Sequence, residues 1–237
     1  MQNKSGIIRT TGIIALVFVV VVIVWYLLEG FGGGWVSSVP QQAAIDLQNI
    51  ANNRGLYLGF LSIDILYNLG IFALGALFYL IFCSFNRSLA IFGGLGFVTT
   101  GAIWLMMDQP AFAVYQLALE YSAASGTTAG AIVEKAAQLA LWDDYAQAIP
   151  AILLALGLFC FGVLIIRSAA INRLIGWLAI VAGILFLASV PFTFQNSLVS
   201  DIAYYVTEFW ILVIGLWLIL RGVKASEGEP AQTAAKA

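Results

Sequence analysis

Two carboxylates inside apolar runs are the residues of this 237-residue chain best placed to carry chemistry. Asp64 has Tyr67 and Asn68 three and four residues later, so the three side chains share one face of a helix. Glu208 lies in a second apolar run, close to Tyr205. Ionisable groups inside a membrane cost about 2.5–3.5 kcal/mol each and mark functional sites by default. We therefore expect these five residues to include a ligand or proton site.

The two carboxylates could act together or separately. If their helices are neighbours, Asp64 and Glu208 would line one cavity and could share a proton or hold a cation, with Arg54 as a countercharge. Alternatively, Glu208 reaches water at the membrane interface, and Asp64 bonds Asn68 or a tyrosine to fix helix packing. The sequence leaves both interpretations open.

The composition predicts an all-α, polytopic membrane protein. Apolar residues make up 62% of the chain and charged residues 9%, against about 25% charged in soluble domains. Six apolar runs with at most one charged residue each are long enough to span a bilayer core about 30 Å thick. They form one predicted domain over residues 1–224, and residues 225–237 are predicted to be a disordered tail. The spans are expected at roughly 7–28, 56–83, 88–107, 145–166, 174–192 and 202–220.

The first run could instead be a cleaved signal peptide. Its apolar stretch is longer than the usual signal core of about 7–15 residues, which favours a retained helix. It also ends in Trp25 and Tyr26, residues that suit a membrane interface.

The distribution of Lys and Arg predicts the orientation, because cytoplasmic loops hold an excess of these residues. With the N-terminus inside, only Arg54 and Lys135 of the ten basic residues fall outside. We therefore expect both termini in the cytoplasm and a location in the plasma or inner membrane.

Two loops on the extracytoplasmic side are long enough to form a small helical cap. One is helix-compatible up to Asn53, and the other begins at Asp108 and Pro110, which read as helix start signals. Asp143 and Asp144 end this second loop. With Asp108 they are expected to form a solvated acidic rim, because hard cations need about six or more oxygen ligands. No metal site is expected.

Short motifs in two stretches resemble a bacterial family of integral membrane proteins, the domain of unknown function 4386. The first stretch runs from Asn53-Arg54 through Ile63-Asp64 to Asn86-Arg87-Ser88-Leu89-Ala90. The second runs from Ile166-Arg167-Ser168 to Asn172-Arg173-Leu174-Ile175-Gly176, where the family commonly has proline in place of Asn172. The resemblance covers roughly the second to fifth spans. It implies a six-helix fold and no particular function.

The residues that are missing exclude most enzymes. The chain has no histidine, which removes His-based acid-base catalysis, most nucleophile pairs and nearly all zinc sites. Cys83 and Cys160 have no partner nearby in the sequence that would activate a thiol. An aspartyl protease needs two intramembrane aspartates, and the sequence indicates one. We expect no enzyme and no cofactor, and the net charge of -2 gives no reason to expect nucleic acid.

The predicted function is therefore recognition. We expect a binding or accessory protein that recognises a lipid, a small ligand or a membrane partner from the extracytoplasmic side, with the bilayer as its surroundings. The alternative is a small secondary transporter or ion carrier that uses Asp64 and Glu208. Glycine-rich faces, including Gly93, Gly96 and Gly176, are expected to pack helices within the chain, and a homo-oligomer interface stays open.

Overall fold

The computed structural model describes residues 2–168, 171–191 and 198–223, and these contain helices and no strands. The predicted tail and the end of the predicted fifth span at Phe192 lie outside the described residues. The elements are α1 (Gln2–Leu28), a π-helical turn η1 (Glu29–Gly33), α2 (Pro40–Asn52), α3 (Arg54–Phe82), α4 (Arg87–Tyr121), α5 (Gly126–Ala146), α6 (Ala148–Ser168), α7 (Arg173–Ser189) and α8 (Leu198–Leu220).

The helices have the length and surface of membrane spans. Within the described residues, five helical stretches are long and apolar enough to cross a membrane, and α7 is a shorter apolar helix. Large apolar side chains also face outward in stripes; on α1 the stripe is Ile13, Val17, Val20, Ile23 and Leu27, each about half exposed. Such a surface suits lipid rather than water. The prediction of an all-helical, multi-pass membrane protein is confirmed at this level.

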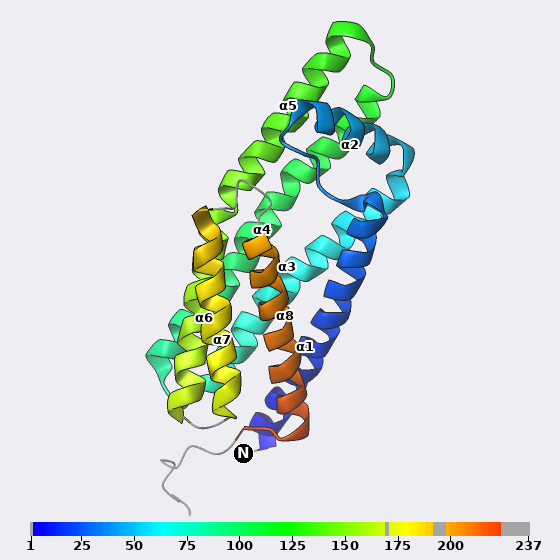
Figure 1. Cartoon of the computed structure of the whole chain (residues 1–237). Coiled ribbons are helices and arrows are strands. Elements are labelled where there is room, and N and C mark those ends of the chain that lie inside the picture. The colour runs from blue at the N-terminus through cyan, green and yellow to red at the C-terminus, as the bar shows by residue number, and fades with distance from the viewer. Residues whose placement is uncertain (1, 169–170, 192–197, 224–237) are drawn as a thin grey trace, which may run out of the picture.

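Six helices close into a ring. In the order α1, α3, α4, α6, α7 and α8, each helix packs against the next, and α8 packs back against α1. The N-terminus and the last residues of α8 lie at the same end of the ring (Figure 1), and we call the opposite end the far end. Because α1 lies between α3 and α8, the helices that carry Asp64 and Glu208 are not direct neighbours.

Glycines allow the ring to close tightly. A Cβ atom on Gly96 would lie 2.6 Å from the carbonyl oxygen of Leu153 and 2.8 Å from the Cα of Gly157, so α4 and α6 touch through their backbones. Between α6 and α7, a Cβ on Gly176 would lie 2.8 Å from the carbonyl oxygen of Gly162. The expected packing of these glycine faces within the chain is confirmed.

The predicted break at Asp108 and Pro110 is wrong. The structure has one helix, α4, that continues through Pro110 to Tyr121, well past the predicted end of the span at Met107. Proline removes one N–H from a helix, and this loss is tolerated in membrane helices where neighbouring groups compensate. At the residue after Pro110, the Tyr57 hydroxyl donates to the carbonyl oxygen of Ala111, 3.2 Å away, and so attaches α3 to this part of α4.

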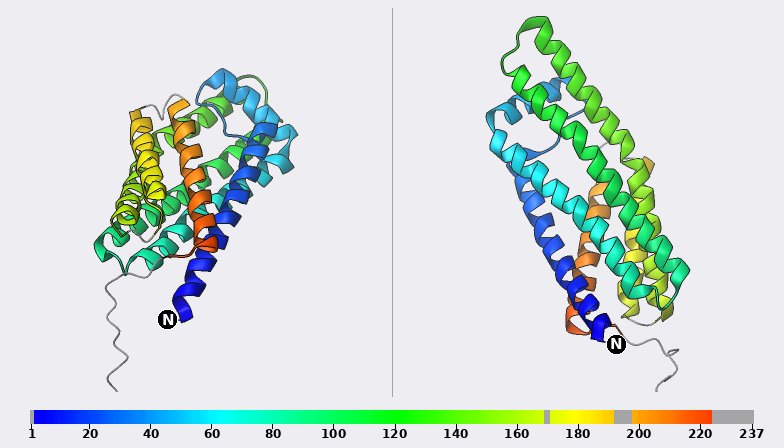
Figure 2. Two further views of the ribbon diagram at one scale, coloured as in Figure 1. Left: turned by 60° about the horizontal axis from the view of Figure 1, so that its bottom comes forward. Right: turned by 180° about the vertical axis from the view of Figure 1, so that it is seen from behind.

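A second layer of helix lies beyond the ring at the far end. The hairpin of α4 and α5 extends past the ends of α7 and α8, and α2 lies across it (Figures 1 and 2). Helix α2 and the hairpin contact each other through a separate apolar cluster. It includes Leu47 and Ile50 of α2, Leu117 of α4, and Ile132 and Ala136 of α5. This layer covers one side of the candidate site.

Candidate functional site

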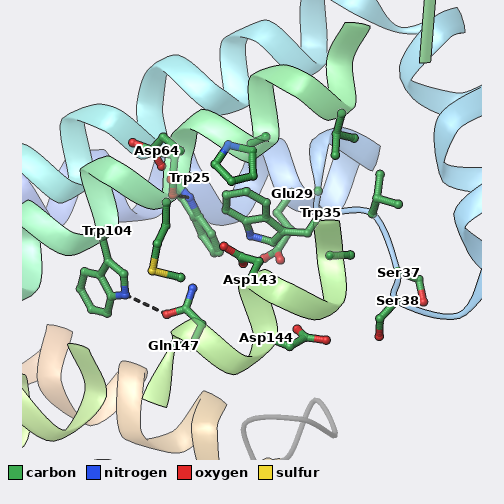
Figure 3. A pocket seen from close by; sticks show the side chains of 18 of the residues that line it. Trp25, Glu29, Trp35, Ser37, Ser38, Asp64, Trp104, Asp143, Asp144 and Gln147 are labelled. Carbon is green, nitrogen blue, oxygen red and sulfur yellow. Dashed lines mark hydrogen bonds between the residues drawn. The ribbon is translucent and has the colours of Figure 1, made fainter. Parts of the chain in front are cut away.

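A cavity of about 980 Å³ lies at the far end of the ring. Its walls come from α1, η1, the segment after it, and parts of α2, α3, α4, α5 and α8 (Figure 3). The volume is at the upper end of the range for small-molecule sites, about 300–1,000 Å³. The cavity is therefore large enough for a small ligand.

The most buried polar group of the cavity is a pair of carboxylates joined by an amide. Asn68 Nδ2 donates to Oδ2 of Asp64 at 3.3 Å and to both carboxylate oxygens of Asp108, at 3.2 and 3.3 Å. All three side chains are at least nine-tenths buried. The hydrogen bond between Asp64 and Asn68 follows the predicted spacing of four residues along α3. Asp108 joins them from α4 because that helix continues through this position.

Helix α1 connects the two predicted carboxylates. Trp25 Nε1 donates to Oδ1 of Asp64 at 2.7 Å, and the hydroxyl of Tyr26, the next residue, donates to Oε1 of Glu208 at 3.3 Å. The sequence suggested a membrane-interface role for these two aromatic residues, but their polar atoms are hydrogen bonded inside the protein. Asp64 and Glu208 thus line one cavity although α3 and α8 are not adjacent in the ring.

Another wall is built at the junction of α5 and α6. Asp143 and Asp144 lie in the last turn of α5 and line the cavity, on a wall apart from Asp64 and Trp25 (Figure 3). Gln147 lies between the two helices, and its Oε1 accepts a hydrogen bond of 2.8 Å from Trp104 Nε1. This bond ties α4 to the junction.

The lining combines negative charge with aromatic rings. Eight of the twelve acidic residues line the cavity, and no Lys or Arg is among its lining residues: the acidic ones are Glu29, Asp46, Asp64, Asp108, Asp143, Asp144, Asp201 and Glu208. Eight aromatic residues also line it, namely Trp25, Tyr26, Trp35, Tyr57, Tyr67, Trp104, Tyr204 and Tyr205. No lining carboxylate forms an ion pair with a described basic residue. The described part of the chain also holds no group of three acidic or Cys side chains placed to bind one metal ion.

The other half of the ring is filled. Phe78, Phe97, Phe161 and Trp210 come from four different helices, and all four are fully buried. In five of the six pairs the ring centroids lie between 5.5 and 6.1 Å apart, within the usual range for packed aromatic rings. We call these residues the aromatic plug. It separates the cavity from the end of the ring that holds the N-terminus.

The structure brings together all five residues that the sequence singled out. Asp64, Tyr67, Asn68, Tyr205 and Glu208 all line the cavity. The proposed countercharge does not belong to this group, because Arg54 is absent from the lining and its Nε donates to the carbonyl oxygen of Ala51 at 3.1 Å.

The sequence reasoning missed Asp108. It placed this residue on a solvated rim, whereas the structure leaves it only 5% exposed beside Asn68. Among the described residues, the structure therefore holds two buried aspartates, Asp64 and Asp108. The expectation of a single intramembrane aspartate no longer excludes an enzyme that uses two. The missed signal was the helical spacing of Met107, Ala111, Val114 and Ala118, which continues across Pro110 on the buried face of α4.

The fold and the cavity define a class of protein: a multi-pass helical membrane protein with an acidic, aromatic cavity in one half of its helix ring. Within that class, the chain matches the model of the family described as Domain of unknown function (DUF4386) over residues 10–222, and it belongs to that family. The resemblance seen in the sequence motifs is thereby confirmed. No curated protein and no solved structure matches the chain.

Proposed function

We propose that this protein crosses the cell membrane six times, with both termini in the cytoplasm, and binds a small ligand in the far-end cavity from the extracytoplasmic side. The positions of arginines support this orientation. Arg87 and Arg173 begin α4 and α7, Arg167 lies in the last turn of α6, and Arg221 follows α8. These four ends lie at the end of the ring opposite to the cavity, as cytoplasmic arginines should.

Helix α7 is the sixth span in this proposal. Its 17 residues reach the lower end of the length that crosses a bilayer core, about 17–25 residues. Its outward stripe is as apolar as that of α1, with Leu174, Trp177, Val181, Ile184 and Leu187 all exposed. The layer of α2 and the α4–α5 hairpin then forms the predicted extracytoplasmic cap.

The observation that carries the proposal is a cavity closed at one end. Polar and charged side chains line its walls in the far half of the ring, and the aromatic plug fills the half beyond it. A channel needs a polar path through the whole bilayer, whereas a binding site needs only one entrance. The arrangement therefore favours recognition of a ligand from one side.

Filling the cavity tests this function. Ala140 lines the cavity from α5, whereas Ala131 on the same helix is exposed and does not line it. The protein should be purified from membranes and analysed by native mass spectrometry. We expect Ala131→Phe to retain the same bound small molecule or lipid as the parent, and Ala140→Phe to lose it because the new ring occupies its space. Equal retention by both variants would show that the cavity is not the binding site.

The second candidate is a secondary transporter, and the pair of Asp64 and Asp108 on Asn68 favours it. Two buried carboxylates without a basic partner are suited to take up a proton or cation and release it again. Flux of solute or protons into vesicles that contain the protein distinguishes the two candidates. Uptake that Asp64→Asn abolishes would make transport the function, whereas ligand binding without uptake supports the first proposal.

A further inference from the structure

We propose that the ligand of the far-end cavity is an organic cation, a protonated or quaternary amine that carries an apolar body. This inference rests on the proposed function, since it names the chemical class of the ligand bound at that site. It stands on three properties of the cavity: the sign of its charge, its aromatic walls and the spacing of its carboxylates.

The charge of the walls selects cations. Carboxylates reach the cavity from η1, α2, α3, α4, α5 and α8, whereas none of the described basic side chains does. A cleft lined by one sign of charge, with low-dielectric walls around it, concentrates ions of the opposite sign. An anionic ligand would meet repulsion without any compensating partner. The cavity is therefore complementary to positive charge.

The aromatic walls favour an amine over a simple ion. Trp104 lies between Tyr67 and Tyr204, with ring centroids 6.0 and 6.2 Å away, and Trp25 lies 5.1 Å from Tyr26. Rings that surround a cation attract it through their negative faces, and this is how proteins recognise quaternary ammonium groups. The same rings provide contact area for an apolar body attached to the charged group.

The spacing of the carboxylates argues against an inorganic cation. Calcium needs about six to eight oxygen ligands in one compact shell. Here the carboxylates are distributed around a cavity of about 980 Å³, and no three acidic or Cys side chains of the described residues converge on one point. A large cation that contacts several walls fits this distribution better than a metal ion does.

Binding of three small probes of similar size tests the ligand class. The probes are benzyltrimethylammonium, neutral benzyl alcohol and anionic phenylacetate. Three tryptophans line the cavity, so quenching of tryptophan fluorescence in the purified full-length protein reports binding, and calorimetry measures the affinity. We expect saturable binding of the cation and none of the anion. Asp64→Asn should raise the Kd of the cation about tenfold, because it removes a negative charge that attracts the ligand.

Glu134→Gln is the matched control, because it removes the same charge from an exposed position of α5 outside the cavity. It should leave the Kd unchanged. An equal effect of both variants, or no saturable binding of the cation, would overturn the inference. If the neutral or anionic probe bound instead and Ala140→Phe blocked it, the proposed binding function would stand and only the ligand class would be wrong. If none of the probes bound, the proposed function would lose this support as well.

Discussion

The side-chain amide of Asn68 holds two carboxylates in one place. Its nitrogen carries two hydrogens, and these serve Asp64 on its own helix and Asp108 on the next. Asp64 has a second donor in Trp25, at the short distance typical of a strong, charge-assisted bond. Asp108 has the amide of Asn68 as one partner and also makes a side-chain hydrogen bond with Asp64 itself. Asn68 and Asp64 therefore hold Asp108 in the cavity together.

Replacing Asn68 alone should destabilise the protein more than replacing Asn68 and Asp108 together. Asn68→Leu removes the amide donor of the buried Asp108 and leaves Asp64 as its remaining side-chain partner, which costs about 1–3 kcal/mol. We expect a lower midpoint of thermal unfolding in detergent. The double variant Asn68→Leu with Asp108→Leu should recover part of the loss, because no carboxylate that lacks its amide donor then remains buried at position 108. A double variant less stable than Asn68→Leu alone would contradict this account of the amide.

At the scale of helices, contact between backbones fixes the ring. Gly96 of α4 and Gly157 of α6 allow these helices to touch, and both helices contribute to the aromatic plug. Small residues perform this role in membranes because packing and hydrogen bonds, rather than exclusion of water, hold the helices together. Separation of α4 from α6 should therefore also loosen the packing of the aromatic plug.

Gly96→Ala should destabilise the fold because its Cβ would meet backbone atoms of Leu153 and Gly157, which cannot move aside like the end of a flexible side chain. A loss of about 1–3 kcal/mol is the usual cost of overpacking. Gly59→Ala on α3 is the control, because nothing lies within 4 Å of its Cβ position. Thermal unfolding of the two variants should show a loss at position 96 only. Unchanged stability of Gly96→Ala would mean that α4 and α6 can separate without cost.

At the scale of the whole molecule, the two ends of the ring differ in chemistry. Arginines begin or follow the helices at one end, whereas the acidic cavity and the layer of α2 and α5 occupy the other. If the proposed orientation is correct, reagents outside the cell reach only the acidic end.

Labelling of single cysteines measures this orientation directly. With Cys83 and Cys160 replaced by alanine, Ser125→Cys places an exposed thiol between α4 and α5, and Ser88→Cys places one at the start of α4. We expect a membrane-impermeant thiol reagent to label position 125 in intact cells, and position 88 only after the membrane is opened. The reverse pattern would place the cavity on the cytoplasmic side.

The sequence predicted much of this architecture because long apolar runs with few charges indicate membrane helices without knowledge of their neighbours. It also paired Asp64 with Asn68, since four residues along a helix fix that contact. It could not predict the bond from Trp25 to Asp64, which joins residues 39 positions apart through the packing of α1. It misplaced Asp108 because Asp and Pro signal a helix start only when tertiary packing does not extend the helix.

The depth of the cavity has an electrical consequence. Asp64 lies ten residues into the 29-residue helix α3, about a third of the way along it from the far end. A ligand with one positive charge that reached this depth from outside would cross about a third of the transmembrane potential. The transmembrane potential is worth about 2.3 kcal/mol per charge per 100 mV. At a potential of about 100 mV, a third of it therefore changes the binding free energy by about 0.8 kcal/mol, or the affinity roughly fourfold. Its occupancy would rise when the membrane is energised with a negative interior, so the site would respond to voltage as well as to concentration.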